Sequence, residues 1–428
     1  MRKLLVRRSL TAVGIYASVV LGFLGTVVAT RELHSTRLFG DYATVIFATG
    51  FVQSLFDLTV EEALVKYGFR YSTRGEWGRF RRLFVEATRV KLLGSALGAA
   101  GLVVFSQLAP ARLEVPALLA AGIPLGQSLE GLAGAMLYLR SRYDIRSLFL
   151  AWSMALRLTG IAVGAHFGLD EAIAGVLAAQ VAATASVAIA GLAAFRRFPA
   201  ARSEPLADRR EIVSFVLQSS VATGVLSLRG GLAPLLLGAV TSTTQVGLFR
   251  VAQAPQSGFQ ALSAPARMVL LTEQTRDWEK GRQRAVLRGV RRYSLAALVI
   301  SLLAAPPLVI WIPDLIRHIN GPQYVGASDA ARLFVLAAAI QLVVGWTKSF
   351  PVTIGRPGLR IVTHGIETLV VLPLVVVFGV LWGATGAAGA VLAGMCAFAV
   401  VWAFVFVRIR PEDLGPPSPV PDTGAALP

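Results

Sequence analysis

Apolar residues along this chain gather into blocks of about twenty, and short polar stretches rich in arginine separate the blocks. A helix of about twenty apolar residues spans the hydrocarbon layer of a membrane, which is about 30 Å thick. The blocks lack the polar–apolar alternation of barrel strands, and lipid offers no partner to an unpaired peptide group, so the spans must be helices. The pattern predicts an all-α polytopic membrane protein with about twelve transmembrane helices, at residues 9–30, 41–64, 84–108, 116–139, 148–166, 172–195, 212–238, 245–271, 293–312, 329–347, 359–380 and 386–407.

The distribution of lysine and arginine sets the orientation of these spans. With the spans placed as above, 33 of these residues fall at the N-terminus, in alternate connections and after the last span, and five fall on the opposite side. Positive charge is retained on the cytoplasmic side of a membrane. We therefore expect a multi-pass protein of the plasma membrane with both termini in the cytoplasm and an even number of spans.

Composition excludes several other classes of protein. Of the 428 residues, 55% are hydrophobic and 15% are charged, whereas soluble domains carry about 25% charged residues. The net charge of +17 follows the membrane topology and does not indicate nucleic acid. Cys396 is the single cysteine and the four histidines are far apart, so we expect no disulfide framework, no metal site and no cofactor.

Two short segments of the chain repeat at corresponding positions. STRLFGDY at residues 35–42 precedes the second span and STTQVGLF at residues 242–249 precedes the eighth, with Gly40 matching Gly247. Such a repeat predicts two parallel six-helix lobes around a central cavity, at residues 1–200 and 201–410, with alternating access between them. The proline-rich residues 411–428 are expected to form a disordered cytoplasmic tail.

The sequence resembles the polysaccharide-biosynthesis flippases of the multidrug/oligosaccharidyl-lipid/polysaccharide exporter superfamily. The resemblance rests on the glycine-x-aromatic start of the second span (Gly40, Tyr42), which continues through residues 51–68, on QVGLFRVAQA at residues 245–254 and on GPQYVGASDAARLFVLAA at residues 321–338. It implies translocation of a lipid-linked sugar intermediate by two six-helix lobes that form a V. Members often carry an acidic or polar residue near the middle of the seventh span. This chain has Arg229 there, so the resemblance supplies no coupling-ion site at that position.

Arginines inside the spans are the candidates for binding substrate, because a charge at mid-membrane costs about 2.5–3.5 kcal/mol. Arg229, Arg250 and Arg157 could hold a phosphate headgroup, since arginine binds phosphate through two parallel hydrogen bonds and keeps its charge. The glycines and the proline that follow Arg229 loosen its helix, which is tolerated where protein or water lines the site.

A structural role is the alternative for each of these arginines. Each could pair with a carboxylate such as Glu130 or Glu367 and hold two helices together, and Arg157 could lie near an end of its helix and reach the interface.

Acidic and histidine side chains inside the spans are the candidates for coupling transport to a proton or sodium gradient. Asp57 lies deepest of the three acidic residues in the second span, and Glu367 lies one turn from His364 on one helix face. An ordinary intrahelical hydrogen bond is the alternative for that second pair. We expect Glu61 and Glu62 to pair with Lys66 or Arg70, which follow them in the chain.

The leading functional hypothesis is a flippase, and not an enzyme, that moves a polyprenyl-pyrophosphate-linked oligosaccharide from the inner to the outer leaflet. Its expected partners are the lipid-linked glycan, membrane lipids, a coupling H⁺ or Na⁺ and polysaccharide-assembly enzymes. Three alternatives remain open: a drug or metabolite exporter of the same superfamily, a membrane polymerase, ligase or glycosyltransferase, and a scaffold that has lost transport. The short outer loops disfavour the membrane enzyme, because they leave no room for a catalytic domain.

Overall fold

The computed structural model describes residues 2–56, 58–258, 274, 277–278, 282–348, 350–353 and 358–408. Within these ranges the regular elements are helices, and no strand occurs. Seven helices in the described part are long and apolar enough to cross a membrane, and the bent pair α2–α3 passes the same test when it is taken as one span. The all-α membrane architecture expected from the sequence is confirmed.

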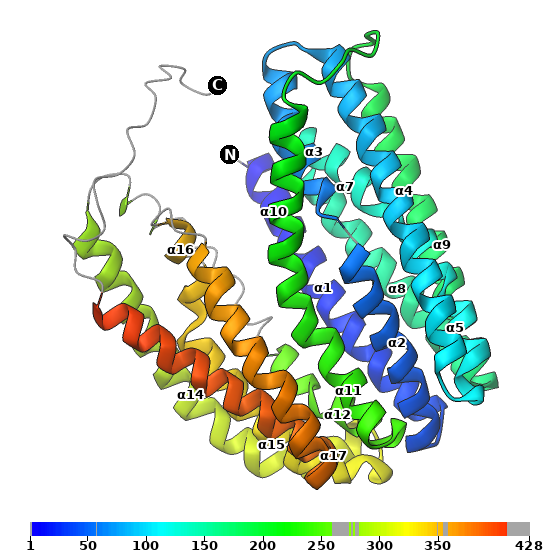
Figure 1. Cartoon of the computed structure of the whole chain (residues 1–428), viewed down its shortest axis with the longest axis vertical. Helices are drawn as coiled ribbons and strands as arrows, with labels where there is room; N and C mark the ends of the chain where they lie inside the picture. Colours follow the sequence, from blue (N-terminus) through cyan, green and yellow to red (C-terminus); the bar gives the residue numbers. More distant parts are fainter. Residues whose placement is uncertain are drawn as a thin grey trace.

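The N-terminal half of the chain forms the first lobe, drawn from blue to cyan in Figure 1. Within it α1 packs along α8, α8 packs along α9, and α9 packs against α5, α6 and α7. The elements of this lobe are α1 (Arg2–Glu32), α2 (Thr36–Phe56), α3 (Val60–Thr73), α4 (Trp77–Leu108), η1 (Ala111–Leu113), α5 (Glu114–Ala120), α6 (Gly122–Gln127), α7 (Glu130–Leu139), α8 (Tyr143–Phe167) and α9 (Leu169–Arg196).

The second lobe is built from the C-terminal helices, of which α14 packs on α15 and α15 on α17. α17 is a hairpin of two helices, because the backbone is not helical at Trp382 and Gly383, where φ is 56° at the glycine. The returning half packs on the first half, and the ring of His364 stacks on that of Phe398. The elements are α14 (Gln283–Ile319), η3 (Pro322–Ala327), α15 (Ser328–Val343), η4 (Gly345–Lys348), α16 (Phe350–Thr353) and α17 (Gly358–Arg408).

Four further elements lie between the two lobes: α10 (Arg209–Ser227), the π-helix η2 (Leu228–Leu232), α11 (Ala233–Val240) and α12 (Thr243–Ala252). α10 packs partly on α3 of the first lobe, whereas α11 packs on α17 of the second. The division of the chain at residues 200 and 201 stays a prediction, and the tail at 411–428 lies outside the described residues.

The lobes meet at one end of the molecule and diverge toward the other (Figure 1). The largest hydrophobic core cluster contains residues from both lobes, among them Phe39, Ile173 and Phe334. These residues lie toward the end where α1 turns into α2 and α11 into α12, which the charge distribution predicts to be the outer end. Two other clusters belong mainly to one lobe each, around Tyr67 and around Trp402. The protein is therefore closed at the predicted outer end.

Several predicted spans are interrupted in the structure. The span at 41–64 ends at Phe56 and restarts at Val60, the span at 116–139 consists of α5, α6 and α7, and the span at 212–238 contains η2. The spans were predicted from blocks of about twenty apolar residues, and a break of a few residues does not change the apolar character of such a block. The spans were therefore located and their interruptions were not. The part of the span at 245–271 that follows residue 258 lies outside the described residues.

Candidate functional site

The two halves of the chain meet where α2 crosses α12, and the repeated motif forms this crossing. A Cβ atom added to Gly40 would lie 2.5 Å from the carbonyl carbon of Thr243, and one added to Gly247 would lie 3.2 Å from the carbonyl oxygen of Thr36. Gly40 and Gly247 are equivalent in the repeat, and so are Thr36 and Thr243, so the crossing has an approximate twofold symmetry. Only glycine lets the two backbones approach this closely.

Four side chains gather just inside this crossing. The guanidinium of Arg250 lies 5.1 Å from the centroid of the Phe47 ring. Tyr42 is close enough to Arg157 and Arg250 for both charges to act on its hydroxyl, and the two arginines also act on each other. Arg157 comes from α8 of the first lobe and Arg250 from α12, so the structure brings together two of the three arginines singled out from the sequence.

Both arginines lie within the depth of the membrane spans. Arg250 is seven residues beyond the first residue of α12, or about 10 Å along the axis at about 1.5 Å per residue. Arg157 is ten residues from the predicted outer end of α8, or about 15 Å along that axis. The interpretation of Arg157 as a residue near the end of its helix is wrong, because α8 extends well beyond it in both directions.

Neither arginine forms an ion pair with a carboxylate in the described part of the chain, and both side chains are partly exposed. The carboxylates considered as partners bind elsewhere. Glu130 lies 3.5 Å from Arg146 and accepts a hydrogen bond of 2.9 Å from Gln180. Glu367 pairs with His364. Two partly exposed like charges with no acid between them favour an anion as their occupant.

Arg229, the third arginine, has its backbone in the π-helix η2, while its side chain lies outside the described residues. The local loosening expected from the glycines is present, because a π-helix is a departure from regular α-helical hydrogen bonding. Gly231 faces α2, where an added Cβ would lie 2.8 Å from the Cβ of Phe51. The role of Arg229 stays a prediction.

The coupling candidates do not form one site. Asp57 lies outside the described residues. In the second lobe, Nδ1 of His364 and Oε2 of Glu367 are 3.0 Å apart, and both side chains are buried. The hydrogen bond expected from their spacing is confirmed, and a role of the pair in coupling stays a prediction.

The expected partners of Glu61 and Glu62 are wrong. Lys91 of α4 donates to Glu61 over 2.5 Å, and Ser219 of α10 donates to Glu62 over 2.6 Å. Arg70 instead binds the carboxylates at the start of α10, each at 3.1 Å: Asp208 and Glu211. Spacing along one helix predicted local pairs, but packing against α4 and α10 brought other partners closer.

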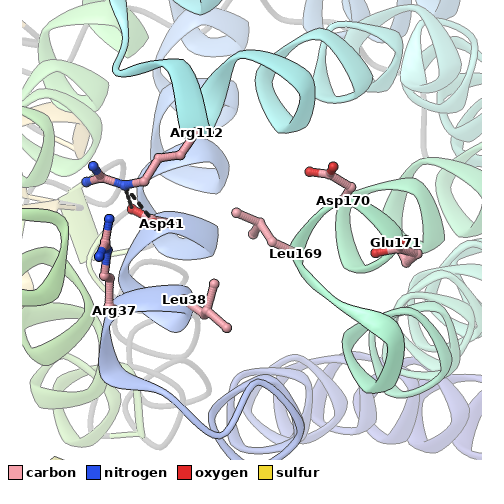
Figure 2. A pocket seen from close by; sticks show the side chains of 7 residues that line it. All are labelled: Arg37, Leu38, Asp41, Arg112, Leu169, Asp170 and Glu171. Atoms are coloured by element: carbon pink, nitrogen blue, oxygen red, sulfur yellow. Dashed lines mark hydrogen bonds and ion pairs between the residues drawn. The ribbon is translucent and has the colours of Figure 1, made fainter.

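A second polar region, which sequence reasoning missed, lies at the predicted outer end. It is a cavity of about 460 Å³. The side chains that line it, drawn in Figure 2, are Arg37, Leu38, Asp41, Arg112, Leu169, Asp170 and Glu171. Asp41 is buried and lies 3.1 Å from Nε of Arg112, whose Nη2 donates to Oγ1 of Thr243 over 3.3 Å. In the sequence, Asp41 at the first position of the second predicted span was the feature that could have indicated this region. Among the described residues, no cluster of three histidine, cysteine or acidic side chains could hold a metal ion.

Comparison with known sequences finds one matching family. The model of the polysaccharide biosynthesis protein family matches residues 8–271. No curated protein matches the sequence significantly.

Comparison with solved structures gives the fold. An inward-facing multidrug resistance MATE family transporter of the MOP superfamily has a TM-score of 0.67 at 11% identity, covering 96% of this chain and 98% of its own. The lipid II flippase MurJ, in an inward closed conformation, has a TM-score of 0.66 at 13% identity, covering 95% of this chain and 89% of its own. An outward-facing MATE transporter scores 0.55 at 12% identity, covering 94% of this chain and 96% of its own. The chain thus has the fold of these MOP superfamily structures.

Proposed function

Because the chain belongs to the polysaccharide biosynthesis protein family, we propose that it is a flippase that moves a polyprenyl-pyrophosphate-linked oligosaccharide from the inner to the outer leaflet of the plasma membrane. The fold is that of a transporter superfamily that includes a lipid II flippase. In the proposed orientation both termini are cytoplasmic, and the lobes diverge toward the leaflet in which the substrate is assembled.

One observation carries the substrate class: Arg157 and Arg250, from the two halves of the chain, lie near enough for their charges to act on each other, and neither has a carboxylate partner among the described residues. Arg250 is placed there by its contact with the ring of Phe47. A pyrophosphate is a compact anion that two guanidinium groups can bind by bidentate hydrogen bonds. Tyr42 adds a hydroxyl to the same space. Separation of the lobes at the outer end would move the arginines apart and release the headgroup there.

Binding of an unglycosylated polyprenyl pyrophosphate to the protein in nanodiscs tests this proposal. Hydrogen bonds to charged groups contribute about 1.5–3 kcal/mol, so Arg157→Ala and Arg250→Ala should each weaken binding by about tenfold or more. Arg250→Lys should fall between alanine and the wild type, because lysine keeps the charge and loses the bidentate geometry. Arg89→Ala, which removes an exposed guanidinium on α4, is the matched control and should bind normally. Equal affinity in all four variants would refute the assignment.

Deletion of the protein in its host tests the transport itself. A flippase defect should cause lipid-linked oligosaccharide to accumulate in the inner leaflet and surface polysaccharide to fall. Normal export in the deletion strain, with no other flippase induced, would contradict the proposed function.

The second candidate is a drug or metabolite exporter, since a multidrug transporter matches this fold as well as the lipid II flippase does. A site for cationic drugs needs a carboxylate in the cavity, whereas the residues gathered here are two arginines, a tyrosine and a phenylalanine. Binding of a lipophilic cation that competes with the pyrophosphate lipid would favour the exporter.

Coupling to a proton gradient is proposed through His364 and Glu367, because a buried imidazole and carboxylate in hydrogen-bond contact can hold a proton between them. Asp57 is the second coupling candidate, for a proton or a sodium ion. Transport into proteoliposomes that responds to neither a pH gradient nor a sodium gradient would refute both assignments.

A further inference from the structure

Arg31, the next-to-last residue of α1, donates hydrogen bonds to two main-chain carbonyls of the other lobe. Its Nε donates to the carbonyl oxygen of Ile319 over 2.8 Å, and its Nη2 donates to that of His318. Both acceptors lie in the last turn of α14. α1 belongs to the first lobe, because it packs along α8, whereas α14 packs on α15 in the second. The contact therefore crosses between the lobes.

The acceptors are groups that α14 cannot satisfy by itself. The last carbonyls of a helix have no partner within it, and they carry the partial negative charge of the helix dipole. The turn that follows α14 returns the N–H groups of Asn320 and Gly321 to the carbonyl of Ile316. Among the described residues, Arg31 is the side chain that donates hydrogen bonds to the carbonyls of His318 and Ile319. The C-terminal cap of α14 is completed by a cation from the opposite lobe.

Neighbouring contacts reinforce the same junction. Nδ2 of Asn320 donates to Oγ1 of Thr30 over 3.1 Å, and both of these side chains are buried. Tyr324 packs edge-on against Phe39 at 5.6 Å between ring centroids. In the described part of the chain, the hydrogen bonds that join α1–α9 directly to α14–α17 all lie at this end of the molecule.

We propose that Arg31 is a gate-holding residue, which keeps the outer ends of the two lobes together by capping α14 across the lobe interface. The inference rests on the proposed alternating access. In the outer-closed state the guanidinium neutralises the end of α14, and in an outer-open state both groups must be hydrated by water instead. Loss of Arg31 thus destabilises only the closed state and shifts the population toward the open one.

Labelling of a buried cysteine measures that population without any glycan. Ala43→Cys, made in a Cys396→Ser background, places a thiol on α2 where the native alanine is 2% exposed and packs against Val246 of α12. A hydrophilic maleimide should react slowly while α2 and α12 are in contact. Arg31→Gln should raise the labelling rate in nanodiscs by about two- to fivefold, the range expected when an exposed cation is removed from the C-terminus of a helix. Arg31→Lys should give a smaller increase.

The matched control is Arg317→Gln, which removes an exposed arginine from the same end of α14 that pairs within its own helix with Asp314. It should leave the labelling rate unchanged. Equal rates for Arg31→Gln and the control, in folded protein, would overturn the proposal. If Arg31→Gln fails to fold, disulfide trapping of Thr30→Cys with Asn320→Cys replaces it. The oxidised protein should label more slowly and recover on reduction, and unchanged labelling would refute the gate.

This outcome is separable from the substrate assignment. Faster labelling of Arg31→Gln combined with no binding of pyrophosphate lipid by the wild type would leave the gate in place and remove the proposed substrate. Normal lipid binding by the wild type, with no change in labelling of Arg31→Gln, would keep the proposed substrate and remove the gate.

Discussion

Alanine at Gly40 should force the two halves of the chain apart at the crossing of α2 and α12. The added Cβ would overlap the carbonyl oxygen of Thr243 and lie 2.5 Å from its carbonyl carbon, whereas ordinary van der Waals contact begins at 3.4 Å, so the backbones must separate by more than about 0.9 Å. The obstacle is main chain, which cannot rotate away. Gly247→Ala requires only about 0.4 Å, because its nearest atom, the Cα of Gly40, is 3.0 Å away. At Gly50, on the same helix as Gly40, the added methyl group meets nothing within 4 Å.

These distances predict a graded series of effects on the outer-closed state. Overpacking costs about 1–3 kcal/mol, so Gly40→Ala should lie at the upper end, at about 3 kcal/mol or about a 150-fold change in the ratio of the two states. Gly247→Ala should cost about 1 kcal/mol, or about fivefold. Gly50→Ala should be neutral or slightly stabilising, because alanine is the better helix former by about 0.5–1 kcal/mol.

Distances between spin labels at the outer ends of the two lobes provide the assay. Glu114 of the first lobe and Gln323 of the second are exposed and accept labels without disturbing the core. Gly40→Ala should add a population with a longer distance, Gly247→Ala a smaller one, and Gly50→Ala none. Identical distance distributions for Gly40→Ala and Gly50→Ala, with both proteins folded, would refute the argument that this crossing closes the outer end.

Three further substitutions test the packing of the individual lobes by thermal unfolding in detergent. Glu130→Leu should destabilise the first lobe by about 3 kcal/mol, because it leaves the nearly buried Arg146 unpaired. The double variant with Arg146→Met should recover most of that lost stability. If it recovers none, the ion pair is not the cause of the loss. Gly383→Ala should cost about 1–2 kcal/mol, because φ is 56° there and the new methyl group would lie 2.7 Å from Cδ of Gln245; a wild-type melting temperature would contradict this. Gly160→Ala should cost about 1–3 kcal/mol, since its Cβ would lie 2.7 Å from a carbonyl carbon of α9, and unchanged stability would mean that α8 and α9 can separate freely.

The sequence by itself determined the architecture of this protein. Blocks of apolar residues can satisfy their peptide groups in lipid only as helices, and this fixed the fold class and the approximate positions of the spans. The matched segments around Gly40 and Gly247 correctly pointed to two related lobes. Both glycines appear in the match between the two segments, and no other residue permits the backbone contact that they make.

The tertiary structure decided which charges meet. Spacing along a helix predicts neighbours on that helix, and it succeeded for His364 and Glu367, which pair one turn apart. It failed for Glu61, whose partner Lys91 comes from another helix. Contacts between residues far apart in sequence depend on how the helices cross, and hydropathy contains no information about that.

The same reason explains why the candidate site could be anticipated only in part. Arg157 and Arg250 were identified because a charge in an apolar span is conspicuous. Their approach across the two halves of the chain, and the capping of α14 by Arg31, follow from the closed arrangement of the lobes. Composition shows which residues are costly to bury, and only the packing of the two lobes shows what each of them faces.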